Sequence, residues 1–171
     1  MSTIPQWVLG LFYWVHMVAT IVWVGGLVTL STLVQPVALN TLADGDYLKL
    51  FSRLQQKLQW LGWLCLGTLI VTGLFQMSAH PSYQGFLTIG NRWAAAILVK
   101  HLLVGVMVLL SGYLTWGLNP ALQRLQLLQA SGKEMGESEI KRLRQREVLL
   151  LRANLGLSIA VLAMTAWARV S

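Results

Sequence analysis

Ionisable side chains inside long apolar stretches are the first candidates for chemistry in this 171-residue chain. Four residues meet that description, namely His16, Lys100, His101 and Arg152. If the stretches cross a membrane, each such group is costly in hydrocarbon and therefore predicts a functional site. Arg152 lies about one turn from the end of its stretch, so its side chain is expected to extend to the membrane surface. The two histidines and Lys100 remain as the predicted site.

The two histidines are predicted to lie at nearly the same depth. His16 follows Trp7 by nine residues and His101 follows Trp93 by eight, and each tryptophan begins an apolar stretch. At roughly 1.5 Å of rise per residue, these separations correspond to about 13 and 12 Å. Two level imidazoles on helices that run in the same direction are what a bis-histidine b-type haem, or a bound metal ion, requires. Alternatively, either histidine simply makes a hydrogen bond to a neighbouring helix.

Glycines on the same helix faces extend the predicted site. The His16 face continues through Trp23 and Gly26, and the His101 face continues through Gly105. Small residues beside a ligating histidine would leave room for a flat macrocycle, although they would equally permit close packing of two helices.

Lys100 adds a cation to this region. It points about 100° away from His101 around the helix. Its side chain is expected to contact a haem propionate, to act as a second axial ligand when deprotonated, or to extend outward. The predicted metal ligands are His16 and His101, and the predicted cofactor-binding residues are His16, His101, Lys100, Trp23, Gly26 and Gly105.

The composition indicates the elements that must position these residues. Hydrophobic residues make up 56% of the chain and charged residues only 11%, whereas a typical soluble domain has about a quarter charged residues. A bilayer core of about 30 Å needs roughly 20 apolar residues in a helix. One transmembrane domain with four spans is therefore predicted, over residues 7–34, 58–77, 93–117 and 148–168. This excludes a soluble enzyme, a disordered tail and a nucleic-acid-binding module, and predicts an all-α integral membrane four-helix bundle.

The distribution of basic residues predicts the orientation. Nine of the 13 Lys and Arg residues lie in the first and third connections, against Arg92 and Arg169 on the opposite side. The positive-inside rule then places both termini outside and the two long connections in the cytoplasm of a bacterial-type inner, plasma or thylakoid membrane. Residues 47–61 are amphipathic, which predicts either an interfacial helix or a cytoplasmic extension of the second span. Ser138 is the predicted cap of a helix that leads into the fourth span. No internal repeat is evident.

Short motifs in the first three spans resemble the copper-resistance-D (CopD) family. That family shows a His, then Trp-x-Gly-Gly, then a Pro at the exit of the first helix, and a Lys after a Trp in the third. The matching positions here are His16, Trp23, Gly25, Gly26 and Pro36, with Thr72-Gly73 in the second span and Trp93 and Lys100 in the third. The His and the Lys also resemble those of the HemJ-type haem-binding membrane proteins. The resemblance implies a site at His16 and Lys100, with Trp23, Gly25 and Gly26 as supporting positions.

Three functions follow as hypotheses. The first is a b-type haem between spans one and three, with His16 as one axial ligand and His101 or Lys100 as the other, for electron transfer or an oxidoreductase step. The second is CopD-type copper transport or resistance through His16, His101 and Met17. The third is an accessory subunit of a larger membrane complex. The expected partners are the lipid bilayer and a second copy or a larger complex, with no nucleic acid.

Overall fold

A computed structural model describes residues 5–80, 85, 92–131 and 137–170, and its described secondary structure is entirely helical. Helix α1 (Gln6–Val28) passes through a π-helical segment η1 (Thr29–Val34) into α2 (Gln35–Thr41). Helix α3 spans Asp44–Ser78. Helix α4 (Arg92–Gly112) passes through η2 (Tyr113–Leu118) into α5 (Asn119–Ala130), and α6 spans Glu137–Val170. The predicted all-α fold is confirmed.

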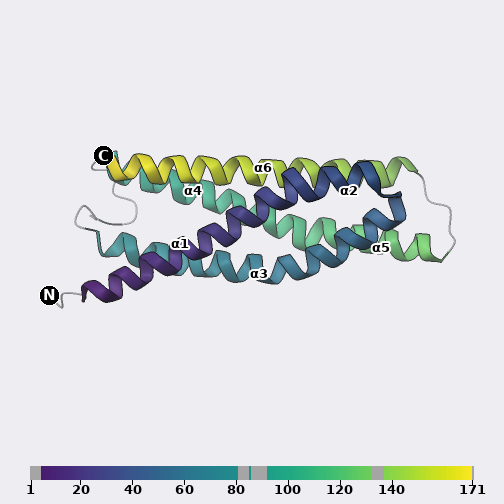
Figure 1. Ribbon diagram of the computed structural model, residues 1–171. Coiled ribbons are helices and arrows are strands. Elements are labelled where there is room, and N and C mark those ends of the chain that lie inside the picture. The colour runs from purple at the N-terminus through teal and green to yellow at the C-terminus, as the bar shows by residue number, and fades with distance from the viewer. Residues whose placement is uncertain (1–4, 81–84, 86–91, 132–136, 171) are drawn as a thin grey trace.

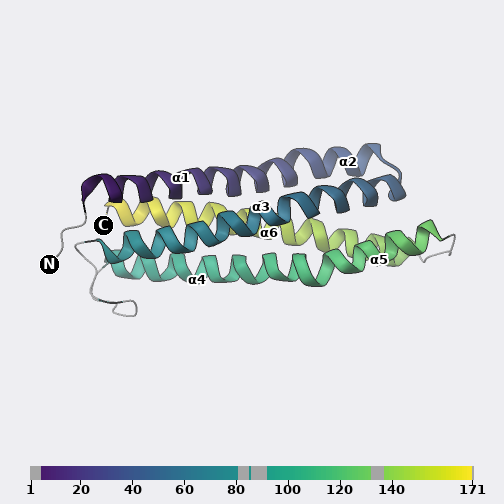
Figure 2. The ribbon, with the colours of Figure 1, turned by 90° about the horizontal axis from the view of Figure 1, so that it is seen from below.

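The helices form one elongated bundle of two hairpins (Figure 1). Helix α1 packs most extensively against α3, and α4 packs most extensively against α6. In the view of Figure 2, α3 and α6 lie between α1 and α4. Helix α1 begins and α6 ends at the same end of the bundle, here called the terminal end; α2, α5 and the start of α6 lie at the other, here called the connection end.

Four helices in the described part of the chain are long and apolar enough to cross a membrane. They cover Gln6–Thr41, Gly45–Ser78, Arg92–Leu125 and Ser138–Ala168. Each therefore continues past its predicted span at the connection end. Residues 47–61 belong to the continuous helix α3, so the extension of the second span is the correct alternative. Ser138 lies in the first turn of α6 instead of capping it, because the helix already begins at Glu137.

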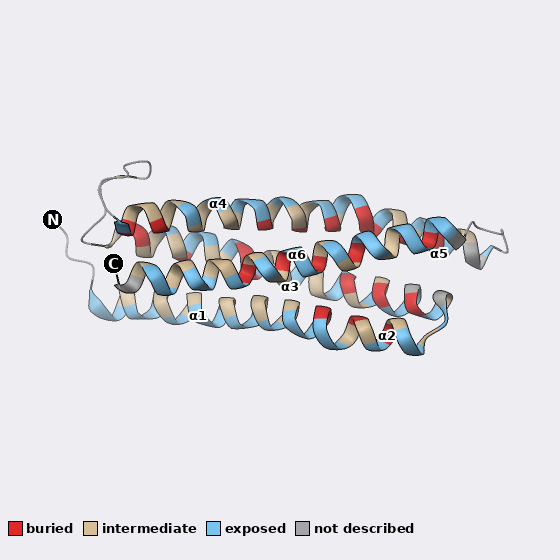
Figure 3. Ribbon diagram, turned by 90° about the horizontal axis from the view of Figure 1, so that it is seen from above, coloured by how far each residue is buried: buried red, intermediate tan, exposed pale blue. Residues whose placement is uncertain are grey.

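Most large apolar side chains on the outer faces are exposed, whereas buried residues gather on the inner faces (Figure 3). Trp7 is 72% exposed and Leu109 is 74% exposed, values that suit a surface covered by lipid. The inner faces meet in a cluster that includes Leu30, Leu114 and Leu151. The exposure pattern supports contact with the bilayer, as the sequence predicts.

The structure reveals an internal repeat that the sequence reading missed. Each hairpin begins with a long helix that widens into a π-helical segment and then resumes as an α-helix. The resumed helix starts with an amide residue followed by proline, which is Gln35-Pro36 after η1 and Asn119-Pro120 after η2. The N–H of Gln35 donates to the carbonyl of Leu30 five residues earlier, and that of Asn119 donates to Leu114 in the same way. Proline lacks an N–H and crowds the preceding turn, so a wider turn accommodates it.

The repeat also relates the predicted site residues. His16 lies 19 residues before Gln35, and Lys100 lies 19 residues before Asn119. Helices α1 and α4 both run from the terminal end to the connection end, so the two halves have the same direction through the bundle. His16 and Lys100 therefore occupy equivalent positions in the two halves.

Candidate functional site

His16 is held in a defined orientation by α3. Its Nδ1 lies 2.7 Å from the Oγ1 of Thr72, which is buried. The Thr72 hydroxyl donates its own proton to the carbonyl of Thr68 at 2.6 Å, so it accepts from His16. Nδ1 must then carry the imidazole proton, and Nε2 carries the lone pair. A histidine that ligates a metal through Nε2 has this arrangement.

Close contact between α1 and α3 brings these two side chains together. Gly73 follows Thr72, and a Cβ on Gly73 would come within 3.5 Å of the His16 ring. Phe12 and Phe75 stack with ring centroids 3.9 Å apart, and the amide of Gln76 donates to the Phe12 carbonyl at 3.1 Å. Thr72 thus supplies a hydrogen-bond acceptor for the imidazole, and Gly73 lies beside the ring, where an added methyl group would make an ordinary van der Waals contact.

Lys100 lies on the inner face of α4. The buried residues of this helix are Trp93, Ala96, Met107 and Ser111, and Lys100 falls on the same stripe at helical spacing. Its side chain is partly buried and close enough to His16 for the two charges to interact. Lys100 thus faces the interior of the bundle from α4, while His16 contacts α3.

His101 has different surroundings. Its Nδ1 lies 2.7 Å from the carbonyl of Ile97, one turn back in its own helix. Gly105, on the same face, is exposed, and the neighbouring Leu102 is 64% exposed. Gly105 thus adjoins the outer surface and not the space between α1 and α4. The ligation of a cofactor by His101 stays a prediction.

Trp23 and Gly26 lie farther along α1. The Trp23 ring covers Gly62 of α3, where an added Cβ would come within 2.9 Å of it. Both residues line a small groove with Cys65, about two turns from His16. Their contacts with α3 indicate a role in packing α1 on α3, and their role in binding a cofactor stays a prediction.

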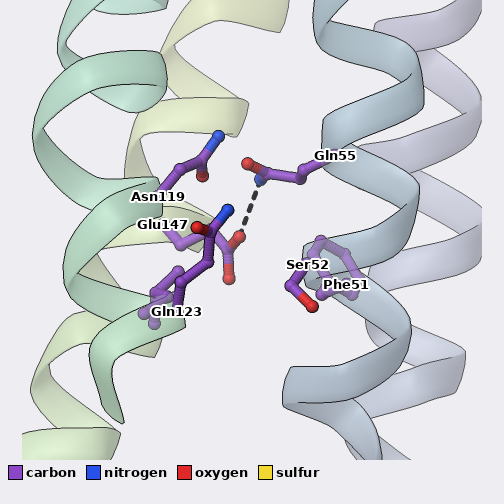
Figure 4. Close-up of a pocket in the computed structure, with 7 residues that line it drawn as sticks. Phe51, Ser52, Gln55, Asn119, Gln123 and Glu147 are labelled. Atoms are coloured by element: carbon purple, nitrogen blue, oxygen red, sulfur yellow. Dashed lines mark hydrogen bonds between the residues drawn. The ribbon is translucent and has the colours of Figure 1, made fainter. Parts of the chain in front are cut away.

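A second polar site lies at the connection end, and the sequence reading missed it (Figure 4). Glu147 of α6 is 1% exposed. One carboxylate oxygen accepts from the amide of Gln55 at 2.7 Å and the other accepts from the hydroxyl of Tyr47 at 3.2 Å. The Arg144 guanidinium lies over the Tyr47 ring, 4.2 Å from its centroid.

The charged run before the fourth span concealed Glu147, since five basic or acidic residues precede it within eight positions. The signal that identifies it is spacing. Glu147 continues a stripe of buried residues along α6 whose members are Ile140, Glu147, Leu151, Asn154 and Ser158. A carboxylate on such a stripe faces the bundle interior, unlike its neighbours.

Comparison with known protein families shows which family the chain belongs to. The family model for Copper resistance protein D, CopD, matches residues 52–168, more than two thirds of the chain. The protein belongs to the CopD family. Neither the curated proteins nor the solved structures contain a match. The matched region includes Thr72 and Lys100 and excludes His16, so the part of the predicted site on α1 rests on its contacts with α3.

The donor set of this CopD protein is poor in ligands for a copper ion. No group of three or more His, Cys, Asp or Glu side chains gathers within the described residues. Met17 is 60% exposed on the outer surface, and Cys65 is buried in the groove beside Trp23. A copper ion at His16 would find one imidazole, whereas stable copper sites draw on several soft or imidazole ligands. A haem needs fewer protein ligands, because its ring supplies four nitrogens.

Proposed function

We propose that this CopD protein binds a b-type haem in the half of the bundle near the terminal end and uses it for electron transfer or an oxidoreductase step. The observation that carries the proposal is the hydrogen bond from His16 to Thr72, which leaves the Nε2 lone pair of His16 available as an axial ligand. When bound, a haem supplies one-electron chemistry that no side chain provides.

The side chains have distinct roles in this proposal. Thr72 fixes the tautomer and the orientation of the imidazole. Lys100, at the equivalent position in the other half of the repeat, would help to hold the haem, either as a ligand through its neutral amine or by neutralising a propionate. The apolar outer faces of α1 and α4 keep the site in a medium of low polarity, which is one of the means by which a protein sets a haem potential.

Copper handling is the second candidate function, and the family match favours it. For a copper site, His16 would need ligands beyond the described side chains near it, such as those of a second copy. This candidate predicts copper in a fixed ratio to protein and a copper-dependent growth defect in a strain that lacks the protein. An accessory role in a larger complex predicts neither haem nor copper.

Absorption spectra combined with metal analysis of the purified protein test these functions. We expect a Soret band and iron in the wild-type protein from haem-replete cells, and we expect His16→Ala to abolish both. His101→Ala separates the two candidates for the second ligand: because His101 is held by its own helix, the Soret band of this variant is expected to persist, which would leave Lys100 in that role. Colourless, iron-free wild-type protein would overturn the proposal, and stoichiometric copper in that protein would establish the second candidate.

A further inference from the structure

Polar side chains from four helices meet in the bundle interior at the connection end. Glu147 of α6 is bonded to Tyr47 and Gln55 of α3. Gln35 of α2 is 1% exposed and adjoins Tyr47, and Asn119 of α5 is 9% exposed and lines a pocket with Glu147. A carboxyl group in this position is expensive in a membrane protein and indicates a function beyond packing.

Some of these groups lack the partners that burial requires. The Oδ1 of Asn154, two turns or about 10 Å beyond Glu147 on α6, has no hydrogen-bond partner, and the Gln35 amide makes no well-aligned hydrogen bond although Tyr47 lies close to it. Buried amide atoms without protein partners are positions where proteins hold internal water or a bound ion. The interior beside Glu147 is therefore suited to a hydrated species.

The two helix interruptions converge on the same place. Gln35 and Asn119, the equivalent residues of the repeat, each directly follow a π-helical segment. Corresponding interruptions in the two halves of a repeat mark the ion or proton sites of many membrane transport proteins, because irregular backbone is tolerated where it lines a polar cavity.

A small pocket of about 10 Å³, enough for roughly one water molecule, lies between Glu147 and the bundle surface (Figure 4). Its lining includes Ser52, Gln55, Asn119 and Gln123, and the side chains of Ser52 and Gln123 are partly exposed. The pocket lies at the connection end, which the basic residues predict to face the cytoplasm. A proton could thus reach Glu147 from that side without crossing the apolar part of the bundle.

The groups that face Glu147 allow both of its charge states. Arg144 approaches Glu147 from the same helix. The neutral hydroxyl of Tyr47 and the amide of Gln55 face it from α3, and the amide of Asn119 faces it from α5. Burial favours the neutral acid, whereas the two donors and Arg144 favour the carboxylate. On protonation the Tyr47 hydroxyl can turn from donor to acceptor, so the acid keeps its partners.

We propose that Glu147 is a proton-exchange site that takes a proton from the connection side onto its carboxylate through the pocket lined by Gln55 and Asn119. Hydronium from the solution gives up the proton and leaves water, and a carboxylate oxygen receives the proton with no change of oxidation state. The site is about five turns of helix from the region of His16, and the inference holds whatever that region binds.

Infrared difference spectroscopy of the protein in lipid nanodiscs tests this proposal. On passing from mildly alkaline to mildly acidic solution, we expect the carbonyl stretch of a protonated carboxyl group to appear in the wild-type protein. Glu147→Gln is expected to abolish that band. Glu139→Gln is the matched control, because Glu139 is exposed on the same helix, and the spectrum of this variant is expected to match the wild type.

Two further measurements keep the test decisive. If Glu147→Gln does not fold, Glu147→Asp retains a carboxyl group, and its band should persist at a displaced frequency. At constant pH, the carbonyl band should be equally strong in sodium chloride and in choline chloride. A weaker band in sodium chloride would show that Glu147 belongs to an alkali-cation site and would overturn the assignment. A wild-type spectrum without the band, or a band that survives in Glu147→Gln, would overturn it as well.

Discussion

Thr72 is the residue on which the chemistry of His16 depends. Its hydroxyl is committed to the Thr68 carbonyl, so it can only accept from the imidazole, and this sets which ring nitrogen holds the proton. The Thr72 side chain is buried, and water is therefore a poor substitute for it.

We expect Thr72→Val to weaken haem binding by about 10- to 100-fold, the usual effect of removing the group that orients a ligating histidine. Thr72→Ser keeps the hydroxyl and should restore most of the affinity. The measurement is the apparent dissociation constant from a haem titration followed by absorption. Equal affinities for the Val and Ser variants would show that the hydroxyl has no orienting role.

At this scale the sequence predicted a site at His16 and Lys100 but not the arrangement around them. Lys100 and His101 are adjacent, and the 100° between them decides which one faces His16. Depth along the helix, which the sequence provides, is the same for both residues. The rotation of α4 about its own axis is set by its packing against α6. The sequence therefore could not decide whether Lys100 or His101 is the second ligand.

Among the helices, the polar contacts of Glu147 join α3 to α6 at the connection end. Removing one donor leaves a buried carboxylate oxygen without its partner, at a cost of about 1–3 kcal/mol. We expect Gln55→Leu to lower the free energy of unfolding by that amount. Gln56→Leu is the matched control: Gln56 is exposed, and its replacement should change stability by no more than about 0.5 kcal/mol.

Unfolding by a denaturing detergent, followed by circular dichroism, would measure both variants. Equal losses of stability would mean that the Gln55 amide does not support Glu147. Because Gln55 and Gln56 differ by one position in one helix, helix propensity and composition are matched, and the comparison isolates the buried hydrogen bond.

The sequence predicted the helices themselves well, because apolar stretches of this length have few alternatives in a bilayer. It did not reveal the repeat. The two halves share little beyond an amide-proline pair, and the equivalence of Gln35 with Asn119 becomes evident only through the π-helical segments that precede them. Backbone geometry had to be seen before His16 and Lys100 were recognised as equivalent.

For the whole molecule, the two polar regions lie toward opposite ends of the bundle. The His16 region is nearer the terminal end, and Glu147 with its pocket is near the connection end. If the basic connections face the cytoplasm, the protein exchanges protons on one side of the membrane and holds its predicted cofactor nearer the other. The orientation therefore determines the direction of any coupling between them.

Labelling of single introduced cysteines tests that orientation in cells. In a Cys65→Ala background, Arg92→Cys and Lys141→Cys each place a thiol at an exposed position, at the terminal and connection ends respectively. We expect a membrane-impermeant maleimide to label the Arg92→Cys variant in intact spheroplasts, and the Lys141→Cys variant only after lysis, because the connections with the excess of Lys and Arg remain in the cytoplasm. The reverse pattern would invert the bundle, placing the Glu147 pocket on the outer side and the His16 region nearer the cytoplasm.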